Sequence, residues 1–185
     1  RRAECGFLVS RSLLETAALH SKEVRSEIRK AVKETCSGKS DISVTFQSAR
    51  TELPVTFIDL AKNERFTEPL PTFDALQLKA ELVRKRPKAY ILPNTCRMQA
   101  EKLRALGIEV EEIGKTFTAT VEKYIVTGYK KVTKEWEKIY PVTVSTRTVK
   151  EKKSFPAGCF IIRLSQKNAN LATTLLEPES VNGFV

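Results

Sequence analysis

The chain has 185 residues, 41% of them hydrophobic, and a formal net charge of +10. This length and apolar content suffice for one domain, or for a domain with a part of another, around a real core. No apolar run approaches the roughly 20 residues that a membrane-spanning helix needs. The sequence therefore predicts a globular protein without a membrane span.

The positive charge is distributed along the whole chain. Lysine and arginine are interleaved with glutamate, which favours a solvated basic surface over a dedicated basic tail. The sequence contains no motif of the kind that binds in a groove of DNA or RNA. We therefore expect no nucleic-acid partner, and binding of nucleic acid through the basic surface is kept only as a third functional class.

A long amphipathic helix is predicted near the N-terminus, over residues 12–36. Charged residues occupy one side of it, and the other side is traced by Leu14, Ala17, Ser21, Val24, Ile28 and Ala31. Gly6–Val9 forms a short apolar run before this helix, and Gly38 is placed to end it. Such a helix packs one face against a larger body.

The composition changes to that of strands after Lys39. Ile42–Phe46 alternates between apolar and polar residues, and Val55–Leu60 is a second β-like run. Glu68–Thr72 contains two prolines, which predicts an extended surface connection because proline cannot donate to a central ladder. Phe73–Val83 fits either a short helix or an edge strand.

The centre of the chain predicts a strand–helix–strand (βαβ) unit. Ala89–Leu92 is a short apolar run, Asn94 or Thr95 can cap the following helix, and Ile108–Ile113 is the second strand. Apolar residues recur at helical spacing at Cys96, Ala100, Leu103 and Leu106. Gly107 stands where a left-handed residue would end the helix. A parallel sheet is the usual location of such a unit.

The C-terminal half predicts further strands and a short helix. Two or three antiparallel strands are expected from Lys115–Val121, Val121–Thr127, Tyr129–Glu137 and Val142–Thr148. Lys150–Lys153 is a predicted charged turn, Phe155–Gly158 a tight turn, and Cys159–Leu164 a buried strand. Asn168–Leu176 is a predicted helix whose inward side chains are Leu171, Ala172, Leu175 and Leu176. The predicted fold class is α/β, a mixed sheet with a βαβ unit, one long N-terminal helix and short flanking helices.

Cysteine and histidine restrict the chemistry. The four cysteines are Cys5, Cys36, Cys96 and Cys159. They have no C-x-x-C spacing, which argues against a structural zinc site. We expect them to be small buried hydrophobic residues, and up to two disulfides could form in an oxidising compartment. His20 is the single histidine, so the chain alone cannot supply the two or three ligands of a catalytic zinc ion. We expect His20 on a helix surface.

Two positions are candidates for charge-based chemistry, and each has two interpretations. Glu15 follows apolar residues and is either a general base with a raised pKa or a first-turn glutamate that complements the helix dipole. Arg84–Arg86 either meets a phosphate or carboxylate, or forms a solvated strand edge that discourages pairing.

Three segments together resemble the C-terminal region of bacterial zinc carboxypeptidases of the carboxypeptidase A-like family. They are Arg86–Pro93, Leu103–Ile108, and the stretch from Phe155–Gly158 through Gln166 to Leu175–Ser180 (Leu-Leu-Glu-Pro-Glu-Ser). The resemblance implies that residues 1–38 are a terminal helical segment of a peptidase catalytic domain. Residues 39–185 would be a C-terminal accessory α/β domain.

The resemblance also implies an activity. Ser12–Thr16 is similar to the family's general-base segment, which makes Glu15 the implied base for hydrolysis at the C-terminus of a peptide substrate. The family's His-x-x-Glu motif, third ligand histidine and substrate-binding arginine are not found, so zinc would be bound by another part of the parent polypeptide and this chain would be inactive alone. An extracytoplasmic location is implied. The alternative is a non-catalytic binding module for a peptide, a glycan or a protein.

Overall fold

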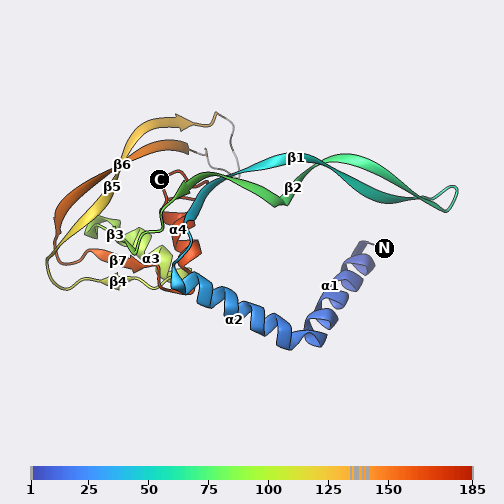
Figure 1. Ribbon diagram of the computed structural model, residues 1–185, viewed down its shortest axis with the longest axis horizontal. Coiled ribbons are helices and arrows are strands. Elements are labelled where there is room, and N and C mark those ends of the chain that lie inside the picture. Colours follow the sequence, from blue (N-terminus) through green and yellow to red (C-terminus); the bar gives the residue numbers. More distant parts are fainter. Residues whose placement is uncertain (1, 134, 136–137, 139, 141, 185) are drawn as a thin grey trace. The chain divides into compact units, whose positions relative to one another are not determined.

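The computed structural model describes residues 2–133, 135, 138, 140 and 142–184. This part of the chain contains four α-helices, one short 3-10 helix and three small sheets (Figure 1), which confirms the α/β class. Two compact units are present. The first comprises the N-terminal segment up to Lys39, Pro87–Phe117 and Phe155–Ala172, and the second comprises Ser40–Arg86, Thr118–Ser154 and the segment from Thr173 onwards.

The N-terminal helical segment consists of two helices, α1 (Arg2–Leu19) and α2 (Ser21–Ser37), which are separated at His20. The prediction of one helix beginning at residue 12 is therefore wrong, and the apolar run Gly6–Val9 lies within α1. Gly38 ends α2 in the left-handed conformation (φ 61°), as predicted. Neither helix contains a buried residue, and α1 exposes six large apolar side chains: Phe7, Leu8, Val9, Leu13, Leu14 and Leu19.

The second unit begins with a long antiparallel hairpin of β1 (Ile42–Asp59) and β2 (Glu64–Arg84). The two predicted runs of β1 form one strand, and the edge-strand alternative for Phe73–Val83 is confirmed. Glu68–Thr72 also belongs to β2, contrary to the prediction of a connection. Prolines are compatible with this position because both strands of a two-stranded sheet are edges.

The sheet of the first unit has the order β3-β7-β4, formed by β3 (Ala89–Leu92), β7 (Phe160–Arg163) and β4 (Glu111–Glu112). Both β3 and β4 pair antiparallel with β7, so they run in the same direction with β7 between them. The predicted strand–helix–strand order is confirmed, but its two strands are not neighbours in a parallel sheet. Phe160 and Ile162, both fully buried, give β7 the central place.

The connection between β3 and β4 contains η1 (Asn94–Cys96) and α3 (Arg97–Ala105). No side-chain capping bond is present at the N-cap of either helix, so the predicted capping by Asn94 or Thr95 is wrong. Gly107 has the predicted positive φ of 76°. Ala100 and Leu103 are fully buried, whereas the predicted core residue Leu106 is half exposed.

The second unit also contains the sheet of β5 (Phe117–Lys131) and β6 (Val142–Phe155). The predicted turn at Lys150–Lys153 lies within β6, where its charged side chains fit a strand of a two-stranded sheet that is largely exposed to water. The predicted strand Tyr129–Glu137 ends at Lys131, and its residues 134, 136 and 137 lie outside the described residues.

The last helix is α4 (Ala169–Leu176), which follows the predicted turn at Gly158 (φ 87°) and β7. Ala172 is buried, but Leu171 is 39% exposed and does not face inward as predicted. All four cysteines are free, and among them Cys159 is buried whereas Cys5 is exposed. No described helix is long and apolar enough to cross a membrane.

Candidate functional site

Arg84, at the end of β2, is the centre of a buried ionic cluster in the second unit. Its guanidinium donates to Glu177 Oε2 at 2.6 Å, to Glu179 Oε1 at 2.7 Å and to Thr146 Oγ1 at 3.0 Å. The Arg84 side chain is only 15% exposed. Of the two interpretations of Arg84–Arg86, the structure confirms a carboxylate partner for Arg84, and the carboxylates belong to the same chain.

Tyr124 completes this set of residues, which we name the Arg84 cluster (Arg84, Tyr124, Thr146, Glu177 and Glu179). The Tyr124 hydroxyl lies 2.9 and 3.0 Å from the two carboxylate oxygens of Glu177, and the Arg84 guanidinium lies 4.8 Å from the centre of the tyrosine ring. Burial, together with the charge and the hydrogen bond of Glu177, raises the pKa of Tyr124. The phenol therefore stays protonated and donates to Glu177.

The Glu179 carboxylate of the Arg84 cluster is ionised. Burial alone would raise the pKa of Glu179, but hydrogen bonds from Arg84 and Thr146 outweigh burial and lower it. Burial likewise opposes the charge of Arg84, and hydrogen bonds to Glu179 and Glu177 nevertheless raise its pKa. Because both carboxylates accept short bonds from Arg84, the cluster suits a structural clasp better than proton transfer to a substrate.

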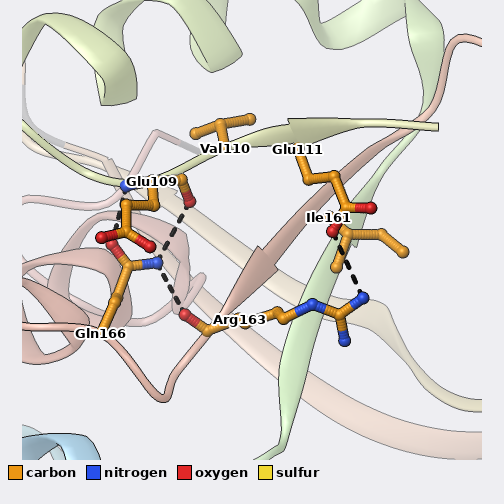
Figure 2. A pocket seen from close by; sticks show the side chains of 6 residues that line it. All are labelled: Glu109, Val110, Glu111, Ile161, Arg163 and Gln166. Atoms are coloured by element: carbon orange, nitrogen blue, oxygen red, sulfur yellow. Dashed lines mark hydrogen bonds and ion pairs between the residues drawn. The ribbon is translucent and has the colours of Figure 1, made fainter.

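The first unit contains an open pocket of about 330 Å³ at the β4 edge of its sheet, which we name the β4 pocket. Its lining residues are Glu109, Val110, Glu111, Ile161, Arg163 and Gln166. In Figure 2 the side chains of Glu109 and Glu111 point to one side of their segment and Val110 points to the other. Arg163 Nη2 lies 3.3 Å from Glu111 Oε2.

Gln166 fixes one wall of the β4 pocket. Its Oε1 accepts from the Glu109 backbone N–H at 2.7 Å, and its Nε2 donates to the carbonyls of Glu109 (3.1 Å) and Arg163 (2.6 Å). The side chain is buried, with 4% exposure. One amide thus satisfies three backbone groups next to the short strand β4 and holds Glu109 in place.

Replacing Gln166 by leucine is expected to lower the free energy of unfolding by about 1–3 kcal/mol, because the apolar side chain leaves buried backbone groups without partners. Urea denaturation followed by circular dichroism measures the loss. Gln47→Leu is the matched control, since Gln47 is exposed on β1, and a change within about 0.5 kcal/mol is expected there. Equal effects of the two substitutions would contradict the role of Gln166.

Neither of the two candidates on the N-terminal helices is one of the residues that form these sites. Glu15 lies in the second half of α1 with 63% of its side chain exposed, and it accepts a 2.7 Å hydrogen bond from Arg11. The first-turn interpretation is wrong because α1 begins at Arg2, whereas the general-base role stays a prediction. His20 is on the helix surface as predicted, with Nδ1 3.0 Å from Glu23 Oε2.

Sequence reasoning assigned no role to the residues that bind Arg84 and Glu109. Gln166, Glu177 and Glu179 were noted only as part of the segment that resembles the peptidase family. No interaction was predicted for Tyr124 or Thr146. Polar residues between the apolar residues of a C-terminal segment were the available clue, because buried polar groups need partners.

The described residues thus define an α/β protein with a buried ionic clasp and an acidic surface pocket. Within the described part of the chain, no group of three or more histidine, cysteine, aspartate or glutamate residues is arranged to hold a metal ion. No family model and no solved structure matches the chain.

The chain is similar over its whole length to fungal carboxypeptidases. It is 27% identical over 184 residues to carboxypeptidase 2 of Trichophyton tonsurans and of Trichophyton equinum, which covers all of this chain and 34% of each relative. Probable carboxypeptidase 2 of Arthroderma benhamiae is 27% identical over 177 residues, 96% of this chain and 34% of the relative. The chain therefore spans about a third of the length of these relatives.

These similarities support a relationship to carboxypeptidases. They do not support the bacterial origin that the sequence resemblance implied, because the relatives are fungal. Their names state neither zinc dependence nor a carboxypeptidase A-like family.

Proposed function

We propose that this chain is the C-terminal portion of a zinc-dependent carboxypeptidase of the carboxypeptidase A-like family, which removes residues from the C-terminus of peptides, and that it is inactive alone. The observation that carries the proposal is the similarity to carboxypeptidase 2 along the entire chain. Because the chain spans 34% of those relatives, the remaining catalytic machinery is assigned to other parts of the parent polypeptide.

The described residues do not fit a zinc site. Zinc in a hydrolase is held by two or three histidines, often with a carboxylate, whereas His20 is the single histidine, half exposed and hydrogen-bonded to Glu23. We therefore assign zinc to the parent enzyme, outside this chain. The extracytoplasmic location belongs to the same proposal and is supported by the resemblance alone.

We assign residues 1–38 to the catalytic domain of the parent and 39–185 to an accessory domain. The exposed apolar side chains of α1 support the first assignment, because a helix that is apolar on most sides is typically buried in a larger core. Glu15 is the proposed general base. In the structure its carboxylate pairs with Arg11 at 2.7 Å on the exposed surface of α1.

The test compares the full-length parent with the 185-residue chain. Release of the C-terminal residue from an N-blocked dipeptide, measured by chromatography, is expected for the parent alone. Metal analysis should find about one zinc per parent molecule and almost none in the chain. Turnover together with tightly bound zinc in the isolated chain would overturn the proposal.

Glu15→Gln in the parent tests the proposed base separately. A fall in kcat of about 10²- to 10⁴-fold is expected, because general-base catalysis contributes that much. Glu4→Gln, on the same helix, is the control and should retain activity. An active Glu15→Gln enzyme would remove the role of Glu15 and leave the carboxypeptidase proposal intact.

The alternative function is a non-catalytic binding module for a peptide, a glycan or a protein. The β4 pocket is the observation that favours it, because its charged lining lies in an open cavity at a sheet edge. Retention of activity by a parent enzyme that lacks residues 39–185 would favour this alternative role for the accessory domain.

A further inference from the structure

The segment after α4, residues 177–184, forms neither helix nor strand, and we name it the C-terminal strap. The N–H of Phe184 donates to the Leu175 carbonyl at 3.0 Å. A Cβ atom at Gly183 would lie 2.8 Å from the Glu177 carbonyl oxygen, closer than real Cβ atoms approach other atoms. The strap is therefore folded back against the end of α4, with no room for a larger residue at position 183.

The C-terminal strap links the two β-ribbons of the second unit. The ribbons β1–β2 and β5–β6 are separate two-stranded sheets. Glu177 accepts hydrogen bonds from Arg84 of β2 at 2.6 Å and from Tyr124 of β5 at 2.9 Å. Glu179 accepts hydrogen bonds from Arg84 at 2.7 Å and from the hydroxyl of Thr146 of β6 at 2.6 Å. Each glutamate of the strap thus joins β2 to one strand of the other ribbon.

Glu179 can lose its charge without a change in its position. Its Oε1 accepts from Arg84 and Thr146, whereas its Oε2 is buried without a hydrogen-bond partner among the described residues. A proton can therefore bind at Oε2 without displacing a donor, and it removes the charge that strengthens the bonds to Oε1. We propose that the strap is a pH-sensitive joint, which holds the two ribbons together at neutral pH and releases them when Glu179 is protonated. This inference does not depend on the carboxypeptidase proposal.

The groups around Glu179 set the direction of the pH dependence. Arg84 of β2 is the cation that contacts it, β6 contributes the neutral Thr146, and Tyr124 of β5 and Glu177 are the other titratable groups of the cluster. Burial opposes the charge of Glu179, but hydrogen bonds from Arg84 and Thr146 outweigh burial and lower its pKa. The joint is therefore fully present above the ordinary glutamate pKa of about 4.3 and is lost as the pH falls below it. Burial raises the pKa of Tyr124, so the phenol keeps its proton over this range.

Amide hydrogen exchange of the 185-residue chain, measured by NMR as protection factors from about pH 3 to about pH 7, tests the inference. The Phe184 amide reports on the strap, and the Ile108 amide, which donates to the Leu103 carbonyl at 3.0 Å, reports on the first unit. Protection of Phe184 is expected to fall at least about tenfold in acid, the effect of weakening hydrogen bonds to a charged group, while Ile108 stays protected. Simultaneous loss at both amides would show global acid unfolding and would overturn the inference.

Glu179→Gln removes the charge at every pH and keeps the shape of the side chain. At neutral pH it should show the reduced Phe184 protection that the unmodified chain shows in acid. Glu112→Gln is the matched control, because Glu112 also pairs with an arginine, Arg97 at 2.8 Å, but in the first unit, and Phe184 protection should not change. Full protection of Phe184 at neutral pH in Glu179→Gln would contradict the proposal.

Gly183→Ala loosens the strap without changing a charge, because the added Cβ collides with the Glu177 carbonyl. Nuclear Overhauser contacts between Arg84 and Tyr124, whose ring centre lies 4.8 Å from the guanidinium, report on the joint between the ribbons. These contacts should weaken in Gly183→Ala at neutral pH and in the unmodified chain in acid. Unchanged contacts in a chain whose Phe184 amide has lost its protection would show that the strap does not join the ribbons.

Discussion

Substitution of Arg84 by methionine is expected to lower the free energy of unfolding of the second unit by about 3–5 kcal/mol. The guanidinium is the shared donor of Glu177 and Glu179, whose side chains are 2% and 10% exposed. Its removal takes the shared guanidinium donor away from two carboxylates in a poorly solvated position. A buried pair that loses one partner is costly even where the intact pair adds little net stability.

Hydrogen exchange at the amides of β2, β5 and β6 measures this loss within the second unit. Arg97→Met is the matched control, because Arg97 also pairs with a glutamate but is 53% exposed, and a much smaller loss is expected because solvent screens an exposed ion pair. Arg84→Lys separates charge from shape, since a point charge cannot reproduce the planar fork that reaches both carboxylates. Similar losses of unfolding free energy for Arg84→Met and Arg97→Met would show that the Arg84 cluster does not stabilise the second unit.

Substitution of Phe160 by alanine is expected to destabilise the first unit by about 3–5 kcal/mol. Phe160 is fully buried in the central strand β7, so its removal leaves a cavity between the sheet and α3. The guanidinium groups of Arg97 and Arg104 lie 5.2 and 5.6 Å from the centre of the Phe160 ring. The substitution would also remove these two cation–π interactions.

The expected loss is measured by hydrogen exchange at β3 and β7. Phe66→Ala serves as control because Phe66 is 45% exposed and is stacked on Phe57, with ring centres 5.5 Å apart. Loss of that stacking should cost about 0.5–1.5 kcal/mol beyond the area it buries. If Phe66→Ala destabilised the chain as much as Phe160→Ala, the core would not be centred on β7.

The sequence predicted the structure correctly where a residue type determines the local backbone conformation. Glycine at positions 38, 107 and 158 marked two helix ends and a turn. Apolar periodicity identified the buried residues Ala100 and Leu103 of α3, and a continuous apolar run identified β7. The start of α1 was missed because apolar residues are distributed around that helix, so no amphipathic period separates it from a strand-like run.

Neither the sheet order nor the Arg84 cluster could be predicted locally. The central place of β7 depends on pairing between residues such as Ala89 and Arg163, which are far apart in sequence. Arg84 and Glu177 are 93 positions apart. The sequence left open whether Arg84–Arg86 meets a phosphate or carboxylate or forms a solvated strand edge, because long-range pairing leaves no local pattern that identifies a partner.

The β1–β2 ribbon divides tolerance to insertions and deletions into two zones. Ile42 and Val44 are buried at its base, so adding one residue there would turn the apolar side chains outward and the polar ones inward. Beyond them β1 contributes no buried side chain. Insertions and deletions among homologous chains should therefore concentrate toward the tip of the hairpin, near Asp59 and Glu64. Odd and even numbers of inserted or deleted residues should be tolerated equally there.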